Sequence, residues 1–472
     1  MRKTFTLLAA FAAMAVQAYN YKTPGTGTTY TLQSLSAIEA SHVTKGEAGY
    51  TLADSVTISA GDKFQLADGD VMMLSDGVAF VVEGQADFSV PTAATITHAP
   101  DNYDAQFIRL ETEGATFNFK NVKFDYVGMK SYAANNVTID HCSFVNYHSV
   151  NSNKGPICFG ATGAKLVLTN SYFANNEFAS FSAGANNMIR VKVEGCVFDK
   201  AQTQNRNYPV LNITPGDSII VRNNVIHGSS DLTMVGGISV ANLMGTSGMQ
   251  YVEISGNTVD SCRYGISLTG ALGKAVIKNN TLTNNRFVYN NNANYGGSGI
   301  AIYDSSKSLE VRVSGNHIEN NLWGVTILGG KDVNLGKVQV DGTALSTTDP
   351  EYNEGRNYFK DNGNNGTSYD VAFASGTSYL TVYAQNNAWN VTEPTEANIE
   401  PQVYHQNDDA SLGKLIFTPA LTTAGLSTVK NSTPTAAGEA YYDACGRRSH
   451  NLQPGLNIVR RADGSVVKVL RR

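Results

Sequence analysis

The hydrophobic positions of this chain recur in one short phrase. A β-branched run leads to Asn or Gly, then Asn, one spacer residue and a large apolar residue, as in VRNNVI at 221–226 and IKNNTL at 277–282. The phrase returns roughly every 20–40 residues with no long helical pattern between copies, which is typical of a stacked repeat. Further copies begin at Ile254 and Val313, and looser ones at Phe119, Ile139, Leu168, Val193 and Ala384.

Each phrase predicts a strand, a sharp turn and a second strand. β-Branched residues favour strands, and Asn tolerates the left-handed backbone of a tight turn at little cost. Since the connections leave no room for helices, we predict an all-β fold, a right-handed parallel β-helix of about 10–12 coils, with the hand taken from the crossover rule. The large apolar residues expected to stack inside are Phe124, Phe144, Phe173, Phe198, Ile226, Val259, Leu282, Ile318, Phe359 and Trp389.

The asparagine of the phrase is expected to be structural. Identical Asn side chains on successive coils can hydrogen-bond to one another along the axis of a stack. Asn224, Asn257, Asn280, Asn316 and Asn387 share one register. Turn chemistry and this stacking account for the residue type, so we do not expect these side chains to bind a ligand.

Changes in composition and residue pattern divide the chain into five parts. Residues 1–18, with a positive start, an apolar stretch and a small-residue end, predict a cleaved signal peptide. Residues 19–106 predict an N-terminal cap and the first coils, and residues 107–421 the main β-helix. Residues 422–438 are linker-like, and residues 439–472 form a short basic C-terminal domain with three strand-like pieces.

Composition narrows the range of partners. The 472 residues carry a net charge of −5 and only 16% charged residues, and no basic patch stands out, so nucleic acid is not an expected partner. We expect a monomer. The five cysteines form no CxxC pair, and we interpret them as buried free thiols. Cys142 and Cys196 hold equivalent places two coils apart, which is too far for a disulfide.

The C-terminal domain resembles the sorting domain of the type IX secretion system. The resemblance rests on Tyr442-Asp443 leading to Gly446-Arg447-Arg448, on Pro454-Gly455-Leu456-Asn457-Ile458-Val459, and on Asp463-Gly464 before a basic terminal strand. It implies passage across the outer membrane by the secretion machinery, and a protein that is secreted or held on the outer-membrane surface. A small additional β-domain without this role is the alternative.

One stretch of the main body resembles the pectate lyases. NVTIDHCSF at 136–144 is similar to their WIDHCSF-type phrase, and the repeat phrases of the coils that follow are spaced as in that family. The resemblance implies a pectin-lyase-like fold that engages a polysaccharide, with Asp140 as a catalytic residue and Ca²⁺ ligand and His141 in substrate binding. Ca²⁺ is the expected cofactor, because β-elimination from a uronate needs its carboxylate neutralised, and Glu177 would be a second oxygen ligand.

The catalytic set of that family is incomplete in this chain. Of the family's Arg-x-Pro-x-x-Arg, Pro209 is present and Arg206 lies one place off, while Asn212 stands where the second Arg is expected. Asn cannot act as a base, so His148, Lys154 and Arg206 are the remaining catalytic candidates. The alternative is that Asp140 and His141 are turn residues that bond adjacent coils.

A long polar insertion offers a further candidate surface. The stretch 286–299 carries Tyr289 and Tyr295, whose rings could stack on sugars while Asn amides bond to hydroxyl groups. A solvent loop without function explains it equally well.

Two functions therefore stay open. The first is an exported polysaccharide-interacting β-helix that acts as a polysaccharide lyase with a degenerate motif, or, less favoured, as a glycoside hydrolase. The second is a non-catalytic β-helix for glycan binding or adhesion.

Overall fold

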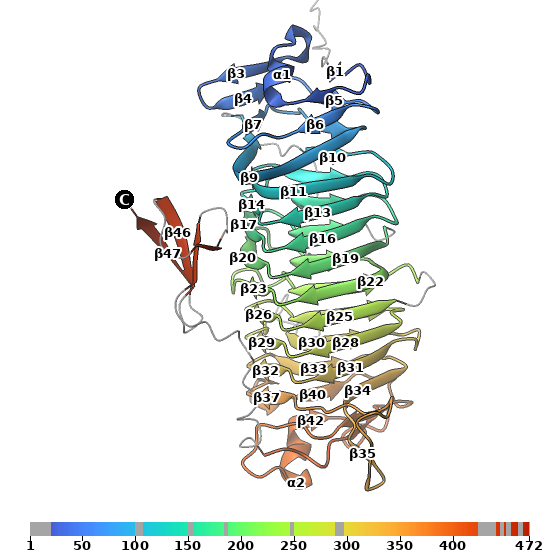
Figure 1. Cartoon of the computed structure of the whole chain (residues 1–472). Helices are drawn as coiled ribbons and strands as arrows, with labels where there is room; N and C mark the ends of the chain where they lie inside the picture. Colours follow the sequence, from blue (N-terminus) through green and yellow to red (C-terminus); the bar gives the residue numbers. More distant parts are fainter. Residues whose placement is uncertain are drawn as a thin grey trace, which may run out of the picture.

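The computed structural model is a parallel β-helix whose coils pile along one axis (Figure 1). It describes residues 20–99, 107–148, 155–183, 187–245, 250–287, 297–422, 440–443, 448–449, 455–460 and 466–471. The predicted signal peptide and most of the predicted linker lie outside these residues. The predicted all-β parallel β-helix is confirmed.

Sheet A runs the length of the stack and contains 14 parallel strands, more than the predicted number of coils. The difference arises because the predicted apolar markers begin only at Phe124, whereas strands of sheet A begin at Tyr21. In spatial order the strands are β1 (Tyr21–Lys22), β5 (Val56–Ile58), β8 (Phe80–Val82), β10 (Phe107–Leu110), β12 (Gly128–Ser131), β15 (Ile157–Phe159), β18 (Phe181–Ala183), β21 (Leu211–Ile213), β24 (Ile238–Asn242), β27 (Ile266–Gly270), β30 (Ser298–Tyr303), β33 (Trp323–Ile327), β40 (Val371–Phe373) and β42 (Val403–Tyr404).

Two further series of strands complete each coil, and we call them sheet B and sheet C. The long strands β9 (Gln85–His98) and β11 (Thr116–Asp125) pass through both series. Sheet B also contains β2 (Thr29–Tyr30), β6 (Lys63–Gln65), β13 (Asn136–Asp140), β16 (Lys165–Thr169), β19 (Ile189–Glu194), β22 (Pro215–Arg222), β25 (Tyr251–Ser255), β28 (Lys274–Lys278), β31 (Glu310–Ser314), β34 (Asp332–Gly336), β41 (Thr381–Ala384) and β43 (Lys414–Ile416). Sheet C contains β3 (Val43–Gly46), β4 (Gly49–Leu52), β7 (Val71–Leu74), β14 (Ser143–Val145), β17 (Tyr172–Asn176), β20 (Val197–Gln202), β23 (Val225–His227), β26 (Thr258–Asp260), β29 (Thr281–Thr283), β32 (His317–Glu319) and β37 (Tyr358–Lys360).

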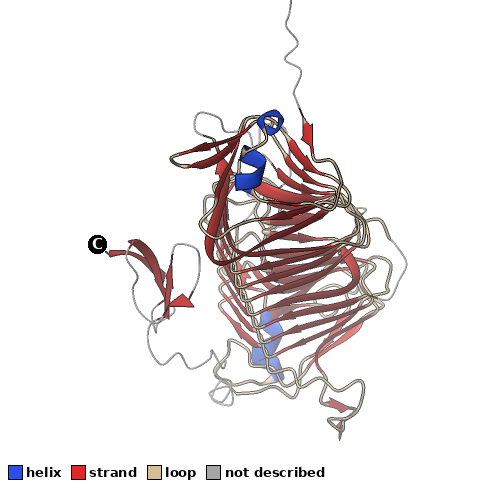
Figure 2. Ribbon diagram, turned by 45° about the horizontal axis from the view of Figure 1, so that its top comes forward, coloured by secondary structure: helices blue, strands red, loops and turns tan. Residues whose placement is uncertain are grey.

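Short helices lie at the two ends of the stack (Figure 2). At the N-terminal end, α1 (Leu32–Ser36) begins with a capping box formed by Thr31 and Ser34, and η1 (Glu39–Ser41) follows. Leu32 and Leu35 are fully buried, so α1 covers the open end of the core. At the other end, α2 (Glu396–Ile399) and η4 (Glu400–Gln402) bring Ile399 into the core.

Two small hairpins extend from the last coils, β35 (Gln339–Val340) with β36 (Thr343–Ala344) and β38 (Gly363–Asn364) with β39 (Thr367–Ser368). The C-terminal domain is a four-stranded antiparallel sheet in the order β45-β44-β46-β47. Its strands are β44 (Ala440–Asp443), β45 (Arg448–Ser449), β46 (Gly455–Arg460) and β47 (Val466–Arg471); β44, β46 and β47 correspond to the three predicted strand-like pieces, and β45 was not predicted.

The predicted file of large apolar residues is confirmed. These residues pair in register from coil to coil, from Phe124 with Phe144 through Ile318 with Phe359. The aromatic members stack face to face, with ring centroids 4.4 Å apart between Phe124 and Phe144 and 4.9 Å apart between Phe359 and Trp389. All of them are buried, and this file fills one corner of a continuous core.

The predicted asparagine file is also confirmed, and it lies inside the turn between sheets B and C. From Asn224 to Asn387, each Asn donates both its main-chain N–H and its Nδ2 to the Oδ1 of the next, at 2.8–3.1 Å. The structure adds Asn357 to this file, between Asn316 and Asn387. In earlier coils Cys142, Ser171 and Cys196 hold the same place, and both cysteines are buried free thiols, as predicted.

A second file of amides, which the sequence analysis did not predict, lies inside the turn between sheets C and A. The main-chain N–H of Cys262 donates to Asn285, that of Asn285 to Asn321, and that of Asn321 to Asn362. The file ends at Asp370, whose Oδ1 accepts from Asn362 Nδ2 at 3.0 Å. Burial raises the pKa of Asp370 to about 7, against the opposing effect of the Asn362 amide and the Asn390 main chain.

The first prediction concerns the asparagine file. Asn280 is fully buried and bonds to the Asn on either side, so Asn280→Ala should lower the free energy of unfolding by about 3 kcal/mol or more, because it leaves several buried partners unsatisfied. Urea denaturation measures this. The control is Thr258→Ala, whose side chain faces outward at the equivalent place one coil earlier and should change stability by less than about 0.5 kcal/mol. Equal midpoints for the two variants would contradict the structural role.

The second prediction concerns Asp370. In the folded chain this carboxyl keeps its proton up to a pH of about 7, whereas the unfolded chain releases it near the ordinary value of 3.8. Its contribution therefore lowers stability as the pH rises between these values, by about 4 kcal/mol in total, and is constant above them. Asp370→Asn should remove this slope and raise the melting temperature at pH 8 relative to the parent chain. Parallel curves of melting temperature against pH for the two chains would contradict it.

Candidate functional site

Asp140 and His141 lie in the turn between sheets B and C. Oδ1 of Asp140 accepts from Thr169 Oγ1 at 2.7 Å and from Asn170 Nδ2 at 2.9 Å, both on the next coil. His141 has a left-handed backbone with φ of 51°, and its Nδ1 lies 2.8 Å from Asp140 Oδ2. These contacts are those expected of turn residues that bond adjacent coils.

The electrostatics of Asp140 fit the same role. Burial alone would raise the pKa of this carboxyl, but the hydrogen bonds from Asn170 and Thr169 and the neighbouring His141 outweigh burial and lower it. The charged form of Asp140 is therefore stabilised by its partners on the next coil. A carboxylate with a lowered pKa is also a weaker base.

Three other predicted residues meet at the corner between sheets C and A, on successive coils. Nε2 of His148 lies 3.8 Å from Glu177 Oε2, and Gln204 Nε2 donates to Glu177 Oε1 at 3.2 Å. The Arg206 guanidinium lies over the ring of Phe178, 5.7 Å from its centre. We call His148, Glu177, Gln204 and Arg206 the corner cluster.

An aromatic group packs beside the corner cluster. Tyr147 and Phe178 are buried, and Phe107 and Tyr208 pack against them. Glu177 is only 8% exposed, so its carboxylate lies at the border of this group. The neighbouring His148 side chain is 44% exposed and reaches solvent.

The predicted residues therefore form two separate groups. Asp140 and His141 precede β14, and His148 follows it, so the groups lie at opposite ends of this strand. Lys154, Tyr289 and Tyr295 lie outside the described residues.

The predicted Ca²⁺ ligands do not fit a shared metal site. Asp140 and Glu177 belong to different corners of the coil. Across the described ranges, no group of three or more His, Cys, Asp or Glu side chains is arranged to hold a metal ion. Ca²⁺ prefers six to eight oxygen ligands, so we derive no chemistry through it at these positions.

A different surface emerges on the outer face of sheet A. One outward position carries small side chains on eight successive strands, and we call this row the sheet A floor. Its members are Cys158, Ser182, Asn212, Ser239, Ser267, Ala301, Thr326 and Ala372. Cys158, Ser182, Ser239 and Ala372 of this row are buried, whereas Asn212, Ser267, Ala301 and Thr326 are partly exposed, so only the partly exposed members can meet a ligand.

Large apolar side chains border this floor. The described chain has eight exposed large hydrophobic residues, and seven of them lie on the outer face of sheet A or in the segments that lead from it to sheet B, while Tyr251 is the first residue of β25 in sheet B. The eight are Tyr132, Leu243, Met244, Tyr251, Tyr303, Leu328, Tyr379 and Tyr404. We call Tyr132, Tyr303, Tyr379 and Tyr404 the tyrosine edge. This gathering of exposed apolar side chains makes the outer side of sheet A the candidate interaction surface.

Cations accompany two of these tyrosines. Lys130 Nζ lies 4.2 Å and Arg109 Cζ 4.8 Å from the ring centre of Tyr132, and Lys307 Nζ lies 3.8 Å from that of Tyr379. Arg109 also pairs with Glu111 at 2.5 Å. The surface thus combines aromatic rings with positive charge, a combination that the spacing of single residues along the sequence does not reveal.

The comparisons with known proteins add no assignment. No protein-family model, no curated protein and no solved structure matches this chain. In the part of the chain that the structure describes, none of the helices has the length and apolar character needed to cross a membrane.

The third prediction separates the two interpretations of Asp140. Because its pKa is lowered in the folded chain, Asp140 contributes stability above its ordinary pKa of 3.8, and this contribution disappears as the pH falls through the folded value. Asp140→Ala should therefore cost roughly 1–2 kcal/mol at pH 7 and less at pH 3. Urea unfolding at both pH values measures this. An unchanged midpoint at pH 7 would contradict the structural role.

Proposed function

We propose that this chain is an exported, non-catalytic glycan-binding β-helix whose binding face is the sheet A floor with its tyrosine edge. The single observation that carries the proposal is the gathering of seven of the eight exposed large hydrophobic residues of the described chain on this face or at its border with sheet B. Tyrosine rings present an apolar face and a polar hydroxyl, which suits the C–H and O–H groups of a sugar ring.

The direction of the surface favours a polymeric ligand. Adjacent strands of a sheet lie about 4.7–4.9 Å apart, so a chain along the axis meets a new strand at each such step. This step is comparable with the length of one monosaccharide unit. Partly exposed hydroxyl and amide groups on the floor, those of Asn212, Ser267 and Thr326, would bond to sugar hydroxyl groups.

The charge of the surface favours an acidic polysaccharide. Arg109, Lys130 and Lys307 stand beside edge tyrosines, where they would meet carboxylate or sulfate groups. This preference agrees with the resemblance of residues 136–144 to pectate lyases, whose substrates are acidic.

Catalysis is the second candidate function, and the corner cluster is the observation that favours it. His148 beside the nearly buried Glu177, with Arg206 on the next coil, provides a base and a cation of the kind that β-elimination requires. In this case the chain would be a polysaccharide lyase.

We further propose export and a location at the cell surface. The support is the signal-like segment 1–18, together with a C-terminal domain whose four antiparallel strands suit the proposed sorting role. The partners would then be a polysaccharide and the outer-membrane secretion machinery.

The fourth prediction tests the binding face. Affinity electrophoresis in gels that contain polygalacturonate, alginate or heparin should show retardation of the full chain by at least one of them. The double variant Tyr303→Ala/Tyr404→Ala should weaken this binding by about tenfold or more, since each lost stacking contact contributes roughly 1 kcal/mol.

The matched control is Tyr172→Ala on sheet C, which should bind like the parent chain. No retardation by any of the three polymers, or equal retardation of the double variant, would refute the proposal. Ultraviolet absorbance of unsaturated products in the same mixtures, lost in His148→Ala, would instead establish the lyase.

A further inference from the structure

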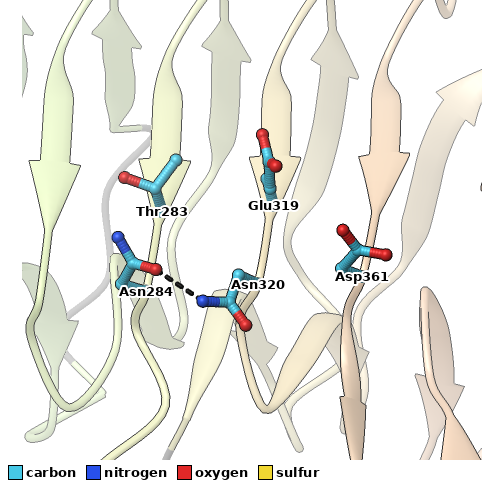
Figure 3. Close-up of a pocket in the computed structure, with 5 residues that line it drawn as sticks. All are labelled: Thr283, Asn284, Glu319, Asn320 and Asp361. Atoms are coloured by element: carbon cyan, nitrogen blue, oxygen red, sulfur yellow. Dashed lines mark hydrogen bonds between the residues drawn. The ribbon is translucent and has the colours of Figure 1, made fainter.

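The strands β29, β32 and β37 of sheet C end in a polar groove of about 470 Å³ on the outside of the coils (Figure 3). Its lining consists of Thr283, Asn284, Glu319, Asn320 and Asp361. We infer that this groove is a second ligand site, separate from sheet A, which binds a neutral, hydroxyl-rich ligand such as a short saccharide.

The local backbone makes these side chains face the same way. Asn284, Asn320 and Asp361 follow the last residues of their strands and have left-handed backbones, with φ of 56°, 53° and 53°. Thr283 and Glu319 are the last residues of β29 and β32 and lie one coil apart in register. Three successive coils therefore supply one surface of amide, hydroxyl and carboxylate groups.

Hydrogen bonds hold most of this lining in place. Asn320 Nδ2 donates to Asn284 Oδ1 at 2.6 Å, and Asn284 Nδ2 and Thr283 Oγ1 both donate to Asp260 Oδ1 at 2.6 Å. Arg286 donates to Asn320 Oδ1. Groups that are already oriented lose little conformational entropy when a ligand binds.

We call the outward side chains of Asn284, Asn320 and Asp361 the outer file, and its hydrogen bonds stop at Asp361. In this file Asn320 donates to Asn284, and Asn284 donates to Asp260, the last residue of β26 on the coil before it. A carboxylate has no N–H to continue this pattern, so Asp361 cannot donate to Asn320. In the described chain no hydrogen bond joins these two side chains, and the space between them stays open.

The charges in the groove disfavour a metal ion. Both carboxylate oxygens of Glu319 are occupied, Oε1 by Lys360 Nζ at 2.7 Å and Oε2 by His317 Nε2 at 2.6 Å. Asp361 Oδ1 accepts from Asn390, and its Oδ2 lies 3.9 Å from Lys360 Nζ. Hydroxyl groups, which both donate and accept, match this mixture of paired carboxylates and amides better than a cation does.

The test uses the full chain and isothermal titration calorimetry with four probes, namely cellobiose, maltose, lactose and CaCl₂. We expect at least one disaccharide to bind. Thr283→Phe, which places a ring in the groove from an outward strand position, should weaken that binding at least tenfold. Ala174→Phe is the matched control, because Ala174 holds the same register four coils earlier, and it should bind like the parent chain.

A second variant covers the case in which Thr283→Phe does not fold. Asp361→Asn supplies the missing donor, so it should close the outer file and also weaken binding at least tenfold. Binding of none of the disaccharides, binding of CaCl₂ alone, or disaccharide binding that neither variant changes would overturn the inference.

The same experiment keeps this inference separate from the proposed function. The double variant Tyr303→Ala/Tyr404→Ala should retain the disaccharide, and Thr283→Phe should retain the acidic polymer. Loss of the disaccharide in the double variant would show that the ligand binds at sheet A and would also overturn a separate site.

Discussion

The structure depends on buried amides that bond along the axis of the stack. From Asn257 to Asn357, each Asn of the first file receives two hydrogen bonds from one neighbouring coil and donates two to the other, so each of these coils is tied to the next. A one-residue slip would break these bonds and would also move the stacked Phe and Ile residues out of the core. The file therefore sets the register of all three sheets, including the outward positions that form the candidate surfaces.

Function in such a stack is confined to what the register leaves on the outside. The same left-handed turns that place Asn280 and Asn285 inside place Asn284 outside, so one backbone pattern serves both stability and surface chemistry. On sheet A the outcome is a row of small residues with a tyrosine edge, and on sheet C it is a polar groove. The two surfaces differ in chemistry, which argues for different ligands.

The repeat made most of the fold predictable from the sequence. The repeat phrase IKNNTL at 277–282 is enough to predict that Asn280 belongs to the asparagine file and Leu282 to the apolar file, because both positions follow from local periodicity. Asn357 was missed because the residues before it, in GRNYFK, lack the β-branched run. The second file could also have been predicted from the sequence. The pairs Asn284-Asn285, Asn320-Asn321 and Asp361-Asn362 recur at the same distance after the large apolar residue of each coil.

The candidate surfaces were less predictable. Tyr132, Tyr303 and Tyr404 are separated by whole coils, and only the pairing of sheet A strands brings them to one face. Motif similarity identified Asp140, whose geometry is that of a turn residue. His148, Glu177 and Arg206 were separate candidates in the sequence, and the structure shows that they lie on three successive coils at one corner. Side-chain position across coils is a property of register, which single motifs do not encode.

Hydrogen–deuterium exchange of the full chain, with and without whichever of polygalacturonate, alginate or heparin it retains, tests the central claim most directly. The account predicts slower exchange on binding in β24, β27, β30 and β33 and in the segments that follow them, with sheets B and C unchanged. Protection confined to the outer face of sheet B, or no protection anywhere, would contradict it.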